Sequence, residues 1–168
     1  MTASYSYYKG GTGKRATEGW YQGMTLIGEA NNVPLPAGTG LWIKGAAGLS
    51  IQTSGQVLNA DLRCDLIDGF RLLGNPFAAD TTLTKLVPSG IGDKSLGVIN
   101  VQLLDASGNM TASYSYYKGG TGKRATEGWY QGMTLITADN DVSIPVGSSV
   151  WVKGATGLGL TFKVPYSL

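Results

Sequence analysis

The sequence predicts an all-β protein: an antiparallel β-sandwich or barrel-like unit of short strands, with at most one short helix. Two compositional observations favour this class, because glycine supplies 26 of the 168 residues and charged residues only 14%. The third is that alternating apolar and polar runs recur about every 8–12 residues between turn signals. Hydrophobic residues make up 42% of the chain, so a packed core is expected rather than disorder.

The expected strands are short and are bounded by glycine, proline or asparagine. They cover residues 3–7, 24–27, 41–44, 49–53, 57–62, 70–73, 98–104, 111–117, 132–136, 150–153 and 158–164. Asp105 to Asn109 predicts a hairpin loop between two of them. One helix is expected over Thr81 to Val87, with Asp80 as its N-cap and Pro88 ending it.

An internal repeat dominates the chain. Residues 1–27 are identical to residues 110–136, and residues 31–49 align with 140–158 at the same offset of 109. Segment 57–109 has no counterpart. A recent duplication, gene conversion or engineering would each leave an identical block beside a diverged one. Because the same residues meet the same backbone preferences, both copies are expected to fold alike, with matching glycine loops.

The repeat predicts the domain organisation. Residues 1–56 correspond to a C-terminal half-unit, and residues 57–168 to a complete β unit in which 110–158 is the second copy. A lone half-unit of this length is not expected to be stable by itself. Met1 corresponds to the internal Met110, so Met1 need not mark a natural beginning.

Composition argues against several functional classes. The chain has no histidine, which removes the commonest general base and the commonest metal ligand. We therefore expect no enzyme, catalytic residue, cofactor or metal. The net charge of +2 does not predict nucleic-acid binding, and no apolar run predicts membrane insertion. Cys64 is the single cysteine, so no internal disulfide can form, and its alternating context predicts a buried thiol.

Two glycine-lysine loops imitate a phosphate-binding loop. They run from Lys9 to Lys14 and from Lys118 to Lys123. A phosphate loop needs a serine or threonine after the lysine and then a helix, but here Arg15 and Arg124 follow. We therefore interpret both as hairpin loops that do not bind nucleotides.

Aromatic residues are the candidate functional side chains. Eight of them are candidates for an interface or for stacking on sugars: Tyr5, Tyr7, Trp20, Tyr21, Tyr114, Tyr116, Trp129 and Tyr130. Strands with aromatic residues on both faces are typical of layer contacts or subunit contacts. Trp20 and Trp129 can also fill a seam between sheets. Trp42 and Trp151 lie between apolar neighbours in their strands, and we expect both in the core.

Several stretches resemble a known domain type. Residues 68–77, DGFRLLGNPF, are similar to a GWNLxGNPF/Y stretch. Residues 144–152 resemble IPxGxGFWV, and residues 35–43 fit that pattern better. Over about two thirds of its length the chain resembles β-domains found in secreted and surface proteins of Bacteroidetes and Verrucomicrobia-like bacteria. The resemblance implies an exported β-sandwich-like domain and carries over no catalytic residue.

These observations lead to two functional hypotheses. The first is a bacterial, self-associating structural protein, a filament, sheath or surface-layer subunit, whose half-unit 1–56 pairs with other strands. It predicts a homo-oligomer or polymer at the cell surface or outside the cell, although no signal peptide is visible. The alternative is a carbohydrate-binding module that uses exposed tryptophan and tyrosine, with a polysaccharide as its partner.

Overall fold

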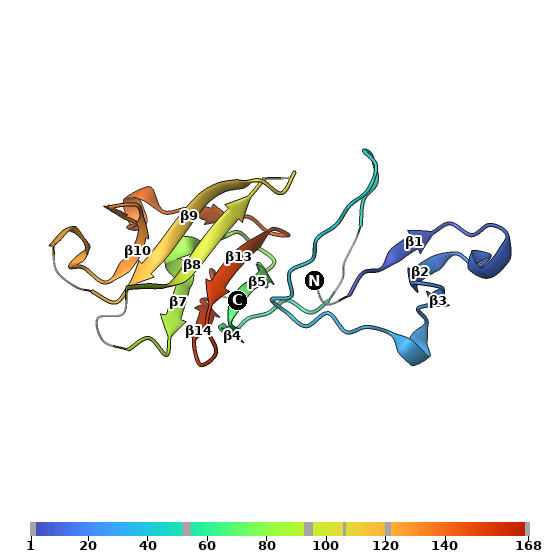
Figure 1. Ribbon diagram of the computed structural model, residues 1–168, viewed down its shortest axis with the longest axis horizontal. Helices are drawn as coiled ribbons and strands as arrows, with labels where there is room; N and C mark the ends of the chain where they lie inside the picture. Colours follow the sequence, from blue (N-terminus) through green and yellow to red (C-terminus); the bar gives the residue numbers. More distant parts are fainter. Residues whose placement is uncertain (1–2, 52–54, 93–95, 106, 120–121, 167–168) are drawn as a thin grey trace. The chain divides into compact units, whose positions relative to one another are not determined.

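A computed structural model describes residues 3–51, 55–92, 96–105, 107–119 and 122–166 (Figure 1). Every regular element in these ranges is a β-strand or a three-residue 3-10 helix, which confirms the all-β class. The chain divides into two compact units, Met1–Pro36 and Ala37–Leu168. No helix within the described ranges is long and apolar enough to cross a membrane.

The first unit is built on one hairpin with a short third strand. Its sheet has the order β1-β2-β3, from β1 (Ser6–Tyr8), β2 (Gly19–Gln22) and β3 (Thr25–Leu26). The 3-10 helices η1 (Gly13–Arg15) and η2 (Glu29–Asn31) lie in its loops. All pairings are antiparallel.

The second unit contains a six-stranded antiparallel sheet in the order β11-β10-β9-β8-β13-β5. Its strands, in that order, are Thr134–Leu135, Gly128–Gln131, Met110–Tyr117, Leu96–Leu104, Ser149–Gly154 and Gly69–Gly74. The predicted hairpin loop joins β8 to β9, where the Asp105 carboxylate accepts hydrogen bonds from the backbone N–H groups of Ser107 and Asn109. The loop is thus fixed by one side chain.

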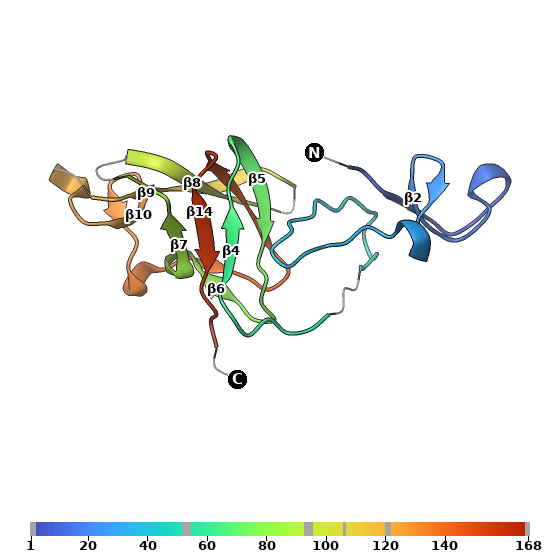
Figure 2. The same cartoon turned by 90° about the horizontal axis from the view of Figure 1, so that it is seen from below.

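A smaller sheet forms the second layer (Figure 2). It has the order β4-β14-β7, from Leu62–Asp65, Gly159–Phe162 and Leu86–Ser89, and a separate pair joins β6 (Thr81–Thr82) to β12 (Ser143–Ile144). The 3-10 helices are η3 (Leu83–Lys85), η4 (Gly122–Arg124) and η5 (Ala138–Asn140). Side chains from both sheets, including Leu73, Val101, Val152, Leu160 and Phe162, form one core.

The first strand of this unit, β4, is joined to its last strand, β14. Phe162 at the end of β14 lies opposite Leu62 at the start of β4. Just outside this pair, Lys163 Nζ lies 2.7 Å from a carboxylate oxygen of Asp61. Farther along, the Tyr166 hydroxyl donates a 2.6 Å hydrogen bond to the carbonyl of Leu58.

The helix expected over residues 81–87 is wrong. This stretch forms β6, the 3-10 turn η3 and the start of β7. Asp80 does not cap a helix, because its carboxylate accepts a hydrogen bond from the backbone N–H of Val146 instead. The β-branched Thr81, Thr82 and Val87 favour extended backbone. Pro88 fits in β7 because that strand lies at the edge of its sheet.

The core positions expected for two tryptophans are also wrong. Trp42 and Trp151 are both exposed. Along β13 the buried side chains are Val150 and Val152, so alternation places Trp151 on the outer face, 5.5 Å from the ring of Phe70. Cys64 is buried as expected, and this burial raises the pKa of its thiol.

Candidate assembly interface

The two copies form the same hairpin. Tyr7 lies opposite Trp20 in the first copy, and Tyr116 lies opposite Trp129 in the second. The 3-10 turn follows the same loop in each, and the glycines at the paired turn positions have positive φ in both copies. Over residues 6–10 and 13–31 the expectation that the copies fold alike is confirmed, whereas residues 3–5 are not in a strand although their counterparts 112–114 lie in β9.

An arginine closes each loop. Arg15 donates a 2.8 Å hydrogen bond to the carbonyl of Gly23, and its guanidinium lies 4.3 Å from the centre of the Tyr8 ring. Arg124 repeats this with Gly132 and Tyr117, at 2.7 Å and 4.4 Å. The residue that replaces the serine or threonine of a phosphate loop therefore holds the hairpin together.

Each hairpin has two different faces. On one face Tyr8 and Tyr21 pack edge to face 5.6 Å apart, and Tyr21 is buried within its own unit. The other face, which we call the docking face, consists of Tyr7, Trp20 and Ile27 in the first copy. Its counterpart in the second copy is Tyr116, Trp129 and Ile136.

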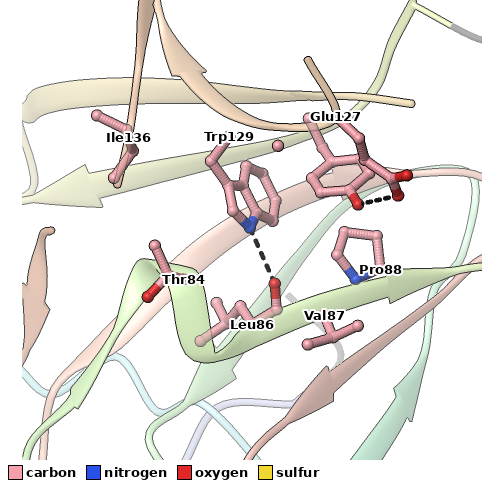
Figure 3. Close-up of a pocket in the computed structure, with 9 residues that line it drawn as sticks. Thr84, Leu86, Val87, Pro88, Glu127, Trp129 and Ile136 are labelled. Atoms are coloured by element: carbon pink, nitrogen blue, oxygen red, sulfur yellow. Dashed lines mark hydrogen bonds between the residues drawn. The ribbon is translucent and has the colours of Figure 1, made fainter. Parts of the chain in front are cut away.

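In the second copy the docking face is packed against the rest of the unit (Figure 3). The Trp129 indole N–H donates a 2.9 Å hydrogen bond to the carbonyl of Leu86 in β7. Beside this contact lies a shallow pocket of about 250 Å³, lined among others by Val87, Pro88 and Ile136. Trp129 thus fills the seam between the two sheets, the structural role considered for it from the sequence.

Strand β8 completes the surroundings of this hairpin. Tyr114, Ser115 and Tyr116 of β9 lie opposite Val101, Asn100 and Ile99 of β8, respectively. The Asn100 amide donates hydrogen bonds to the hydroxyls of Ser113 and Ser115, at 2.9 and 3.1 Å. We call the edge of β8 together with residues 84–88 the acceptor surface.

A charged group flanks the packed tryptophan. The Tyr116 hydroxyl donates a 2.5 Å hydrogen bond to Glu127, and Lys118 lies 3.0 Å from the same carboxylate oxygen. Burial, and after it the hydrogen bond to Glu127, raises the pKa of Tyr116. The hydrogen bond from Tyr116, followed by that from Lys118, lowers the pKa of Glu127.

Two of the three residues of the first copy's docking face are exposed, and Ile27 is half-buried. Trp20 is 41% exposed, whereas the identical Trp129 is 3% exposed. Tyr7 is also exposed, and it packs edge to face on Trp20 at 5.5 Å while its hydroxyl hydrogen-bonds Glu18. Strand β1 has β2 on one side only, because the described part of the first unit has no equivalent of β8.

The difference between the copies continues beyond the identical block. The expected strands at 41–44 and, within the described residues, at 49–51 are absent, although the matching residues 150–153 lie in β13 and 159–160 in β14. Apolar residues there are exposed in the first copy and buried at the matching position of the second. The pairs are Leu35 (56%) and Ile144 (1%), Ile43 (58%) and Val152 (0%), and Ile51 (47%) and Leu160 (0%). Of the strand expected at 57–62, a stretch without a counterpart, only Leu62 lies in a strand.

The eight candidate aromatics thus divide by burial. Tyr21, Tyr114, Trp129 and Tyr130 are buried, Tyr5 and Tyr116 are half-buried, and Tyr7 and Trp20 are exposed. The sequence did not identify the acceptor surface, because its key group is the backbone carbonyl of Leu86. Every residue has a backbone carbonyl, so the sequence does not distinguish one that accepts such a hydrogen bond.

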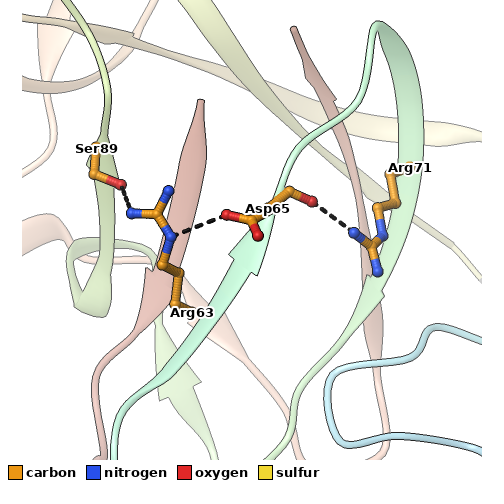
Figure 4. A network of polar contacts seen from close by, with 4 residues as sticks. All are labelled: Arg63, Asp65, Arg71 and Ser89. Atoms are coloured by element: carbon orange, nitrogen blue, oxygen red, sulfur yellow. Dashed lines mark hydrogen bonds and ion pairs between the residues drawn. The ribbon is translucent and has the colours of Figure 1, made fainter. Parts of the chain in front are cut away.

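Polar clusters elsewhere are structural. On the smaller sheet Arg63 lies 3.0 Å from Asp65 and donates to the Ser89 hydroxyl, while Arg71 donates to the carbonyl of Asp65 (Figure 4). This network ties neighbouring strands at an exposed surface. Among the described residues no three acidic or cysteine side chains are grouped to hold a metal ion.

Comparisons with known proteins return no relative: no family model, no curated protein and no solved structure matches the chain.

Proposed function

We propose that this protein is a non-enzymatic, self-associating structural protein, such as a filament, sheath or surface-layer subunit, that assembles through β-strand contacts. One observation carries the proposal. The first copy exposes several apolar side chains whose counterparts the second copy buries, and Trp20 against Trp129 is the sharpest case because the surrounding sequence is identical. Only the presence of a covering surface differs between them.

The size of the exposed apolar surface supports association. Full burial of one such side chain contributes about 1.5–3 kcal/mol, and Trp20, Leu35, Ile43 and Ile51 are all available. Strand β1 also offers an edge with no partner among the described residues, which is a template for another strand. Burial of apolar side chains combined with pairing along a strand edge is the type of contact made when one chain adds a strand to the sheet of another.

The proposed location and the proposed absence of catalysis are supported by the sequence. The resemblance to exported bacterial domains supports a location outside the cell or at its surface. The lack of histidine supports a role without catalysis.

A carbohydrate-binding module is the second candidate, and exposed aromatic pairs favour it. Trp20 with Tyr7, and Trp151 with Phe70, present rings to solvent. Lys153 lies 5.9 Å from the centre of the Phe70 ring. Such surfaces can stack on sugar rings, but Trp129 and Tyr130, which the same hypothesis needs, are buried.

Light scattering and electron microscopy of the full chain test the proposal. The average mass should rise with concentration and ordered polymers should appear. Ile43→Lys should reduce assembly, since it charges an exposed apolar position. Met24→Lys is the matched control, because Met24 and its counterpart Met133 are both exposed and neither copy uses them for packing.

A chain that stays monomeric at high micromolar concentration contradicts the proposal. Retention of that monomer on polysaccharide affinity gels, lost in a Trp20→Ala or a Trp151→Ala variant, would favour the carbohydrate-binding function instead.

A further inference from the structure

We propose that the β1–β3 hairpin of one chain binds the acceptor surface of a second copy, in the place that the β9–β11 hairpin of that second copy otherwise occupies. Hairpin exchange is the contact through which the self-association proposed above occurs, and this inference rests on that proposed function. The partner is therefore a second copy of this chain, and its binding surface is the edge of β8 with residues 84–88.

The fit follows from the identity of the two hairpins. Residues 1–27 and 110–136 have the same sequence, and strands β1 and β2 pair in the register of β9 and β10. Each interaction of the second hairpin is therefore available to the first. Trp20 would donate its indole N–H to the carbonyl of Leu86 of the second copy, as Trp129 does at 2.9 Å.

The free edge of β1 matches the edge of β8 in the same way. Strand β9 extends over Met110–Tyr117 and pairs with β8 along most of this length, whereas β1 covers only Ser6–Tyr8. Residues Ala3 to Tyr5, the counterparts of Ala112 to Tyr114, would join the strand on binding. The exchange therefore lengthens β1 toward its start.

The free-energy balance of the exchange determines when it occurs. The incoming hairpin forms the same interactions that the displaced hairpin gives up, because the two are identical over this block. The second copy's own hairpin is held by the short loop 105–109, and such a tether gives an effective concentration in the millimolar range. Exchange is accordingly favoured by crowding of chains, or by any change that weakens the β9–β11 hairpin alone.

The exchange can continue from chain to chain. The displaced β9–β11 hairpin carries the same docking face, and it can bind the acceptor surface of a third chain. Reciprocal exchange between two chains gives a closed dimer, whereas sequential exchange builds an open series of chains.

Matched tryptophan variants separate the two hairpins. Trp129→Ala weakens only the hairpin to be displaced and should raise the exchanged fraction by about 100-fold, the factor expected for loss of one buried aromatic side chain. Trp20→Ala weakens only the incoming hairpin and should suppress exchange. The double variant weakens both hairpins equally and should return the exchanged fraction to its wild-type value.

Disulfide trapping between two different chains reports the contact directly. Ser113 lies opposite Gln102, and its counterpart in the first copy is Ser4. Directly paired antiparallel residues have Cα atoms about 4.5–5.5 Å apart, within the range for a disulfide. A Ser4→Cys chain mixed with a Gln102→Cys chain should therefore form a disulfide-linked heterodimer, which no intrachain contact can produce.

The control for this experiment is a cysteine on the same hairpin outside the contact. Thr17→Cys is exposed and lies in the loop after η1, so mixed with Gln102→Cys it reports random collision. The chain with only the native Cys64, whose thiol is buried, provides the blank. The Ser4→Cys and Gln102→Cys mixture should give more disulfide-linked heterodimer than the Thr17→Cys mixture. This excess should grow when the Gln102→Cys chain also carries Trp129→Ala. It should vanish when the Ser4→Cys chain also carries Trp20→Ala.

The outcomes distinguish this inference from the proposed function. If the chain assembles but the Ser4 pair links no more than the Thr17 pair, hairpin exchange is overturned and self-association stands. If the chain neither assembles nor links, both fail. If Trp129→Ala does not fold, disulfide trapping with both tryptophans intact, at high chain concentration, still tests hairpin exchange.

Discussion

Replacing Trp129 by alanine should destabilise the second unit strongly, whereas the same change at Trp20 should leave it almost unaffected. Trp129 is 3% exposed and bonds the carbonyl of Leu86, so its removal leaves a cavity and an unpaired acceptor. Truncating a buried tryptophan costs about 3–5 kcal/mol. The lower half of that range applies, because the neighbouring pocket admits water to the freed carbonyl.

At Trp20 only the edge-to-face contact with Tyr7 is lost. Such a pair contributes about 0.5–1.5 kcal/mol, and this contribution belongs to the first unit. The same substitution in the same local sequence therefore has two outcomes that depend on tertiary packing alone. Because the two tryptophans have identical sequence neighbours, differences in local strand propensity do not contribute to the difference in stability.

The assay is thermal unfolding followed by far-ultraviolet circular dichroism at low micromolar concentration, where exchange between chains is negligible. Trp129→Ala should lower the midpoint of thermal unfolding by about 8–15 °C, given the usual shift per kcal/mol for a unit of this size. Trp20→Ala should leave that midpoint unchanged. Equal losses for the two variants would refute the assignment of Trp129 to the seam.

Three further predictions follow from the contacts of the second unit and its loops. Because the pKa of Tyr116 is raised in the folded protein, its contribution to the free energy of unfolding is complete below about pH 10 and is lost as the pH rises further. Tyr116→Phe should therefore reduce the loss of stability at alkaline pH, measured by urea unfolding at several pH values. Asn75→Ala should cost about 2–3 kcal/mol in the same assay, because the amide donates to the carbonyls of Ala79 and Ile144 and its oxygen accepts from the chain N–H two residues on; a loss under half of that would contradict it. Calorimetry should detect no saturable ATP binding at the glycine-lysine loops, and binding that disappears in Lys14→Ala would show the loop interpretation to be wrong.

Much of the fold could be predicted from the sequence because it depends on local signals. Alternation located β5, β8, β9 and β13, and Asp105 to Asn109 located a hairpin loop. The repeat predicted that the two hairpins share their register. Strands β2 and β10 were missed because Gly19 to Gln22 and Gly128 to Gln131 are short and follow glycine loops.

The errors arise where strand formation needs a neighbour. Residues 41–44 have the same pattern as 150–153, yet only the second stretch lies between two strands, β5 and β8. Strand preference is largely a matter of packing and pairing, so the same pattern gives a strand in one place and none in the other. The docking face was among the candidate aromatics, but which copy buries it depends on segment 57–109, and no local pattern reveals that.

The pairing of β4 with β14 means that the first and the last strand of the second unit lie side by side, with Leu62 opposite Phe162 and Tyr166 bonded to Leu58. A module whose two connections are adjacent can be placed within a loop of another protein, or strung one after another on short connectors, with little strain on either neighbour. The connections then occupy one region of such a module, and serial linkage leaves the rest of its surface for other contacts.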